Sequence, residues 1–154
     1  MNAEQRIKDL GLELRVGSAP AGNYAAVVQS GDLLFLSGKG PLPIDGKLPK
    51  GQLGREYSPQ DGYLLARSAC IDLLAVIREH LGSLDRVSQI VELHGSLSTT
   101  PEFEDHARVL DGASDLLVEV FGAAGVHARS VIGVGSLRKG LPLTLKATVE
   151  VKRP

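Results

Sequence analysis

The chain has 154 residues, 43% of them apolar, which is enough for one globular domain with a sizeable core. Its 17 basic and 18 acidic residues leave a net charge of −1, so no overall field attracts nucleic acid or an anionic membrane. A single cysteine, no apolar run near the ~20 residues of a membrane span and no secretory signal at the N-terminus predict a disulfide-free, soluble, cytoplasmic protein.

The first third of the chain reads as a short helix, a loop and a β-hairpin. Ile7 and Leu10 share one face of the helix, and Gly11 ends it. Two β-prone runs are separated by Gln29-Ser30-Gly31-Asp32, which is typical of a hairpin turn. The expected elements are a helix over Ala3–Leu10, strands over Tyr24–Val28 and Leu33–Ser37, and a surface loop over residues 43–54 with a turn at Asp45-Gly46.

Two long helices follow, each with start and stop signals. Ser58-Pro59-Gln60-Asp61 combines a serine cap, a proline at the first helical position and an acid three residues after the cap, so the first helix should run to Leu81. The second should start at Thr100-Pro101 and end at Gly122. The predicted buried stripes are Tyr63, Ala66, Cys70, Leu73, Leu74, Ile77 and Leu81 in the first helix and Phe103, Ala107, Leu110, Ser114, Leu117 and Phe121 in the second.

Three further strands complete the predicted fold, over Val87–Leu97, Arg129–Val134 and Leu143–Val151. In the first of them, Val87, Val91, Leu93 and Leu97 are expected to share one face. The order β-β-α-β-α-β-β predicts a single α+β domain over residues 1–154, in which residues 1–22 form an N-terminal helix and loop and a mixed sheet carries both long helices on one face. The other sheet face is half polar, and it either meets solvent or closes against copies of itself.

Arg129 is a charged residue at the head of a strand that otherwise reads as buried. A guanidinium presents a rigid fork of donors that matches a carboxylate, so one interpretation is a site for a small organic acid. The other is a structural ion pair with an Asp or Glu. The local sequence favours the ion pair, because arginines in such positions are more often paired than catalytic.

Five segments in the same order and spacing resemble one known family. They are Asn23-Tyr24, Leu34-Phe35-Leu36-Ser37-Gly38, Asp111-Gly112-Ala113-Ser114, Ala128-Arg129-Ser130-Val131 and the closing run from Leu143 to Val149. Together they resemble the reactive-intermediate deaminases, the RidA/YjgF or L-PSP endoribonuclease family. The resemblance covers nearly the whole chain from about Ala21 onwards.

The resemblance implies a chorismate-mutase-like fold and a homotrimer whose sheets form a central barrel, with ligand sites in the clefts between subunits. It implies that Arg129 holds the carboxylate of a 2-imino or enamine acid such as 2-aminoacrylate. Tyr24 and Gly38 match the family tyrosine and strand-end glycine, and backbone groups near Val131 would contact the imine end. The implied reaction is hydrolysis to a 2-keto acid and ammonia, with no cofactor.

The chain departs from the family at two candidate catalytic positions. Thr144, followed by Lys146, stands where active members carry an acid that positions the attacking water. A threonine can hold a water by hydrogen bonding but cannot act as a base near neutral pH. Asp111 stands where an asparagine is common, and it either pairs with Arg129 or serves as a replacement base.

Other polar residues have separate expected roles. Lys39 is expected to line the site entrance and attract an anion, and His127 either edges the cleft as a proton donor or has a structural role. The pair Arg138-Lys139 reads as a solvated corner more than as an anion site. The four histidines lack metal-ligand spacing, so no metal is expected, and Cys70 is expected to be an inert core thiol.

Three functions remain open from the sequence. The first is a cofactor-free deaminase of 2-imino or enamine acids. The second is a trimer that binds small carboxylates or keto acids with weakened chemistry. The third is the ribonuclease activity of the family's older name, against which the neutral charge, the few aromatic residues and the lack of a basic cluster argue.

Overall fold

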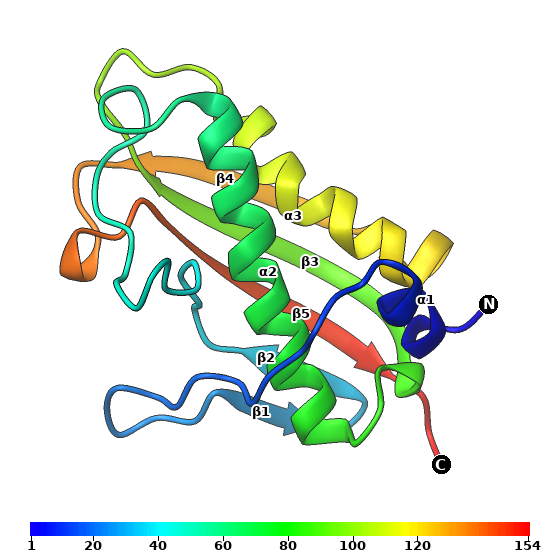
Figure 1. Cartoon of the computed structure of the whole chain (residues 1–154). Helices are drawn as coiled ribbons and strands as arrows, with labels where there is room; N and C mark the ends of the chain where they lie inside the picture. The colour runs from blue at the N-terminus through cyan, green and yellow to red at the C-terminus, as the bar shows by residue number, and fades with distance from the viewer.

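A five-stranded mixed sheet forms one layer of the structure, and two long helices cover one of its faces (Figure 1). The computed structural model describes residues 1–154. The strand order is β1-β2-β5-β3-β4, and every neighbouring pair is antiparallel except β3 and β4. The strands are β1 (Val27–Ser30), β2 (Leu33–Leu36), β3 (Val87–Ser98), β4 (Ala128–Val134) and β5 (Leu143–Val151); the α-helices are α1 (Ala3–Asp9), α2 (Pro59–Leu81) and α3 (His106–Phe121); and the short 3-10 turns are η1 (Leu84–Arg86), η2 (Gly122–Gly125) and η3 (Arg138–Gly140). The predicted α+β fold and element order are confirmed.

Helix α2 begins and ends where its sequence signals predict. The Ser58 hydroxyl accepts from the Asp61 amide, and the Asp61 carboxylate accepts from the Ser58 amide, which completes a capping box. Gly82 ends the helix in the left-handed conformation at φ 83°. The predicted stripe is buried apart from the half-buried Tyr63.

Helix α3 begins at His106, so the predicted start at Thr100-Pro101 is wrong. The Thr100 amide donates to the Leu53 carbonyl, and Thr99 forms a β-bridge with Leu53, so this segment is held extended. The predicted stripe of α3 is also partly wrong. Its buried face carries Val109, Leu110, Ala113, Leu116, Leu117 and Val120, whereas Ala107 is exposed and Ser114 is half-buried.

Strand β3 departs from simple alternation, and Val91 lies 38% exposed instead of in the core. The register of β3 against β5 shifts between Val87 and Gln89 and again between Ile90 and Glu92. Each irregularity adds a residue and moves the following side chains to the other face. Ile90 therefore takes the buried place predicted for Val91, while Val87, Leu93 and Leu97 are buried as expected.

The hairpin leads directly to a change of strand partner. β1 begins at Val27, opposite Leu36, later than the predicted start at Tyr24. Beyond Leu36 the chain leaves β1, and the Lys39 amide and carbonyl pair with Leu145 of β5 at 2.8 Å each. Residues 21–26 are left as a bent segment beside this junction. Tyr24, Gly38 and Lys39 are brought together there.

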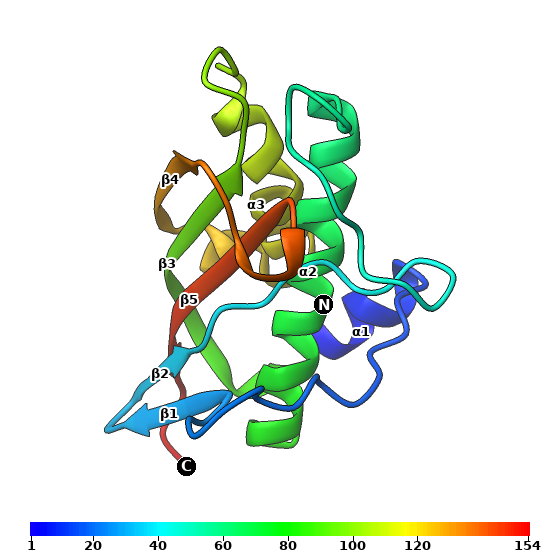
Figure 2. The ribbon, with the colours of Figure 1, turned by 90° about the vertical axis from the view of Figure 1, so that its left-hand side faces the viewer.

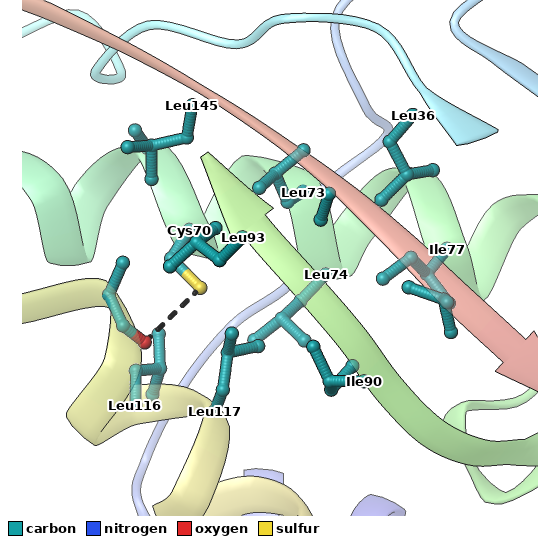
Figure 3. Packing of buried hydrophobic residues seen from close by; sticks show 14 of the residues in the cluster. Leu36, Cys70, Leu73, Leu74, Ile77, Ile90, Leu93, Leu116, Leu117 and Leu145 are labelled. Carbon is teal, nitrogen blue, oxygen red and sulfur yellow. Dashed lines mark hydrogen bonds between the residues drawn. The ribbon is translucent and has the colours of Figure 1, made fainter. Parts of the chain in front are cut away.

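The core lies between the sheet and the helices (Figure 3). Cys70 is fully buried in it, and its thiol donates to the Ala113 carbonyl at 3.7 Å. Burial raises the pKa of this thiol to about 12. The prediction of Cys70 as a core residue is confirmed. None of the helices combines the length and apolarity needed to cross a bilayer.

Candidate functional site

The sequence-predicted site residues lie in two groups at opposite sides of the sheet. Tyr24, Gly38, Lys39 and Thr144 gather near β2 and the start of β5, whereas Arg129, Asp111, His127 and Val131 belong to β4 and α3 or flank them. Two strands, β5 and β3, stand between β2 and β4 (Figure 2). At ~4.8 Å per strand, Lys39, which pairs with β5 from the β2 side, is about three strand spacings from β4, and Thr144 on β5 is about two.

Three residues of the first group line a hollow of about 260 Å³, which we call the cleft. Tyr24, Gly38 and Lys39 are part of its wall. An adjoining hollow of about 350 Å³ shares Tyr24 and Gly38 with the cleft and adds Thr144. Each of these volumes lies near the lower end for ligand sites, so the space suits a small metabolite.

Lys39 is the buried cation of the cleft, with only 5% of its surface exposed. Its ammonium donates to the Ser18 carbonyl and to the Ser18 hydroxyl, both at 2.7 Å. The Ser18 hydroxyl in turn donates to Asp72 Oδ2 at 2.8 Å, and the Ser18 amide donates to Asp72 Oδ1 at 3.3 Å. The buried Lys39 and Asp72 are therefore linked through one serine.

Arg138 and Lys139 also line the cleft, on the side contributed by η3. Both are exposed, as a solvated corner would be, yet they face the space that Tyr24 and Lys39 enclose. Lys139 has φ 56° and ψ 18°, a left-handed conformation that is uncommon outside glycine. Sequence reasoning did not join this pair to the site, because a contact across nearly 100 residues leaves no local signal.

The second group is called the Arg129 cluster. Arg129 Nη1 lies 2.9 Å from Asp111 Oδ1 and donates to the Ser114 hydroxyl at 3.0 Å, while Nη2 donates to the Ala107 carbonyl at 3.3 Å. The structure therefore contains the Arg129–Asp111 ion pair that the sequence offered as one alternative. All these contacts use Nη1 and Nη2, so the Nε–H edge of the guanidinium is left unused.

Ser114 and His127 extend the Arg129 cluster. His127 Nδ1 lies 2.6 Å from the Gly125 carbonyl, which fixes it as the donor, and Nε2 lies 2.9 Å from the Ser114 hydroxyl. With Nε2 as acceptor, Ser114 donates to His127 while it accepts from Arg129. Ser114 was predicted as part of a buried stripe. Its spacing of three residues from Asp111 on one helix was the signal that could have placed it beside Arg129.

A third polar group lies on the sheet face that no helix covers. His94 Nδ1 is 2.7 Å from the Ser130 hydroxyl, and Nε2 is 3.1 Å from Glu92 Oε1. The Thr148 hydroxyl also donates to Glu92 Oε1 at 3.1 Å. The hydrogen bond from His94, and to a smaller extent that from Thr148, stabilises the carboxylate and holds the pKa of Glu92 below its ordinary value. No group of three or more His, Cys, Asp or Glu side chains lies close enough to hold a metal ion.

Known proteins are similar to this chain in sequence and in fold. Residues 4–142 match the model of a family described as "YjgF/chorismate_mutase-like, putative endoribonuclease". Protein TCP17 from Trypanosoma cruzi is 36% identical over 146 residues, which cover 94% of this chain and 91% of TCP17.

Two solved structures superimpose closely. A protein from Shewanella oneidensis, described as a "putative endoribonuclease", is 35% identical with a TM-score of 0.93, covering 98% of this chain and 100% of that one. Atu1372 from Agrobacterium tumefaciens, a protein of unknown function, is 32% identical with a TM-score of 0.88, covering 97% and 92%.

Proposed function

The chain belongs to the YjgF/chorismate-mutase-like family, and from that premise we propose that it is a cofactor-free hydrolytic deaminase of small 2-imino and enamine acids. Its products would be a 2-keto acid and ammonia. The observation that carries this proposal is the division of the candidate residues between the cleft and the Arg129 cluster. The cleft lacks the Arg129 guanidinium, and the Arg129 cluster lacks Lys39 and Thr144. In this proposal the complete site is formed by the cleft of one copy and Arg129 of a second.

Arg129 would hold the substrate carboxylate. Contacts from α3 fix its Nη1 and Nη2 ends, and the Nε edge remains for a ligand. An arginine held in advance loses less conformational entropy when the ligand binds. The ion pair with Asp111 is therefore compatible with ligand binding, because it orients the fork without occupying all of it.

The chemistry requires little from the protein. Protonation at the β-carbon turns an enamine into an iminium ion, water adds to the imine carbon, and the carbinolamine loses ammonia, so the oxygen of water ends in the keto group. Imine hydrolysis is intrinsically fast, and orientation, a proton and a placed water suffice. The Lys39 ammonium would supply positive charge beside the reacting carbon, and Thr144 would hold the water.

A direct assay tests this function. Pyruvate release from enzymatically generated 2-aminoacrylate should accelerate when the protein is added. The alternative, a binder of keto acids with weakened chemistry, is favoured by Thr144 and Lys146, which leave β5 without an acid near the cleft. Keto-acid binding without any acceleration would establish that alternative and reject the deaminase.

Complementation tests the shared site. Arg129→Ala and Lys39→Met should each abolish activity alone, because the first removes the carboxylate fork and the second removes the buried ammonium. Co-expressed, the two variants should recover part of the activity, since some sites then combine an intact cleft with an intact Arg129. A mixture as inactive as its parts would contradict a site between copies.

We propose a homotrimer as the assembly that brings the two halves together. Its contact surface would be the open sheet face, where Val28, Phe35 and Ile132 are exposed beside polar side chains. Closed symmetric assemblies are the usual form of soluble oligomers. Light scattering that finds a monomer at micromolar concentration would reject both the trimer and the shared site.

A further inference from the structure

The cleft has more positive charge than a single carboxylate needs. Its charged lining consists of three basic side chains, Lys39, Arg138 and Lys139, and one acidic side chain, Asp72. None of the three cations has a carboxylate within 4 Å. Elsewhere in the chain, Arg67, Arg78, Arg129 and Arg153 all form ion pairs. Other exposed cations, such as Arg55, also lack an ion pair; these three differ in that they line one cleft.

Asp72 does not neutralise this charge at close range. It is buried, and both of its oxygens accept from Ser18, one from the amide and one from the hydroxyl. Ser18 in turn faces Lys39 through its carbonyl and hydroxyl oxygens. The lysine thus meets neutral oxygens and not a carboxylate.

Lys39 keeps one donor for a ligand. An ammonium has three N–H groups, and Ser18 accepts from two of them. The buried Asp72 compensates the charge of Lys39 only through Ser18, and not by direct contact. An anion in the cleft would make that direct contact with the third N–H.

The conformation of η3 places two further cations on the same wall. Lys139 adopts a left-handed backbone conformation, and Gly140 follows it at φ 71°. The Gly140 amide donates to Leu137, and the Gly140 carbonyl accepts from Gly51, so the turn is held at both ends. Strained backbone of this kind persists where the surroundings fix it, and it is found preferentially at ligand sites.

We propose that the substrate carries a second anionic group, at the end away from its α-carboxylate. This inference rests on the proposed function: the α-carboxylate would bind Arg129 of a second copy, Arg138 and Lys139 would bind the distal anion, and Lys39, beside the reacting carbon, would add positive charge between the two ends. The substrate class is then a 2-imino or enamine acid whose side chain ends in a carboxylate or a phosphate. The cleft volume of about 260 Å³ leaves room for a short side chain of this kind.

Calorimetry with stable keto acids tests the second anion directly. 2-Oxoglutarate, with two carboxylates, should bind about tenfold more tightly than 2-oxobutyrate, with one, because the additional charge-assisted hydrogen bonds favour the dianion. 3-Phosphohydroxypyruvate carries a phosphate at the distal end, so its affinity relative to that of 2-oxoglutarate shows whether the cleft prefers a phosphate or a carboxylate there. Equal affinities for the one-charge and two-charge acids would overturn the inference.

Arg138→Gln locates the preference. It should remove most of the advantage of the dianion and weaken 2-oxobutyrate binding by a smaller factor, because 2-oxobutyrate has no distal anion for Arg138 to hold. Arg55→Gln is the matched control: Arg55 is exposed, forms no ion pair and lies outside the cleft. An Arg138→Gln variant that keeps the full preference, or an Arg55→Gln variant that loses as much, would overturn the assignment.

The outcome separates this inference from the proposed deaminase. A protein that prefers the dianion but accelerates hydrolysis of neither 2-aminoacrylate nor enzymatically generated 2-iminoglutarate supports the inference and rejects the deaminase. A protein that hydrolyses 2-aminoacrylate and binds both keto acids equally does the reverse.

Discussion

The cleft and the Arg129 cluster treat charge in opposite ways. In the Arg129 cluster every charged group has a protein partner: Arg129 contacts Asp111, Ser114 and Ala107. In the cleft, Lys39, Arg138 and Lys139 have no carboxylate partner. The difference indicates two tasks. The contacts of the Arg129 cluster fix the position of Arg129, and the cations of the cleft are available to a ligand. A site assembled from both would combine a fixed fork with an open pocket.

The two regions also rest on different supports. The Arg129 cluster is attached to α3, and α3 packs closely on α2 at Gly112. The cleft is built from β2, η3 and the loop around Ser18, with Asp72 of α2 behind it. Substitutions can therefore disturb one region and spare the other.

Gly112→Ala should have the largest effect, and it should act on the support of the Arg129 cluster. A Cβ at this position would lie 1.9 Å from the Tyr63 carbonyl oxygen, a backbone atom that cannot move without shifting α2. We expect a loss of about 2–3 kcal/mol or more in the free energy of unfolding, seen in urea denaturation. Gly135→Ala is the control, because a Cβ there meets open space. Equal stability of the two variants would contradict the close helix packing.

Arg129→Ala should chiefly affect binding. Loss of the fork should weaken keto-acid binding by about tenfold or more, and Arg129→Lys should recover only part of it. Stability should fall by no more than about 1 kcal/mol, since Asp111 is 47% exposed and stays hydrated. Arg67→Ala is the matched control: its ion pair with Glu119 is similarly exposed but lies outside both regions. Equal loss of stability without loss of binding in both variants would make Arg129 a purely structural residue.

Cys70→Ala should affect neither region, because the thiol lies in the core beneath them. The smaller side chain should lower stability by about 1 kcal/mol and leave keto-acid binding unchanged. Since the pKa of the thiol is raised to about 12, the native protein should resist alkylation at pH 8 and react only in urea. Rapid alkylation of the folded protein, or loss of binding in a stable Cys70→Ala variant, would contradict this.

Glu92→Gln should have the smallest effect and tests the open sheet face. Hydrogen bonds from His94 and Thr148 lower the pKa of Glu92 in the folded state below the ordinary 4.5. As the pH falls, Glu92 is protonated first in the unfolded chain. The contribution of its carboxylate to the stability of the folded state is therefore complete above about pH 4.5 and is lost as the pH falls through the folded pKa. Glu92→Gln should flatten the acid limb of a stability–pH curve. Glu150→Gln, a change of an exposed acid on β5, should leave it unaltered.

Local signals predicted those elements whose ends are decided locally. The capping box at Ser58 and the glycine stop at Gly82 gave α2 correctly, and strict alternation gave β5 over Leu143–Val151. The start of α3 was wrong because Thr100 is held by Leu53, a distant partner. Val91 was placed in the core because a shift in strand register cannot be read from alternation alone.

The candidate site was predictable as a set of residues but not as an arrangement. The sequence named Arg129 with Asp111 as its partner, and the structure contains that pair. It did not show that Tyr24 and Lys39 lie across the sheet from Arg129, since strand order is a property of tertiary pairing. The place of Arg138 in the cleft depends on the same long-range pairing.

The outer position of β4 has a consequence for how assembly can be observed. β4 pairs only with β3, so every second peptide group between Ala128 and Val134 points away from the sheet. Such groups are templates for another chain, and closure into a barrel removes them. In an isolated chain these amides should exchange their hydrogens with water quickly, whereas those of β5, paired on both sides, should be slow. Deuterium uptake along β4 would therefore distinguish an assembly that pairs this edge with another chain from one that makes contact only through the open sheet face.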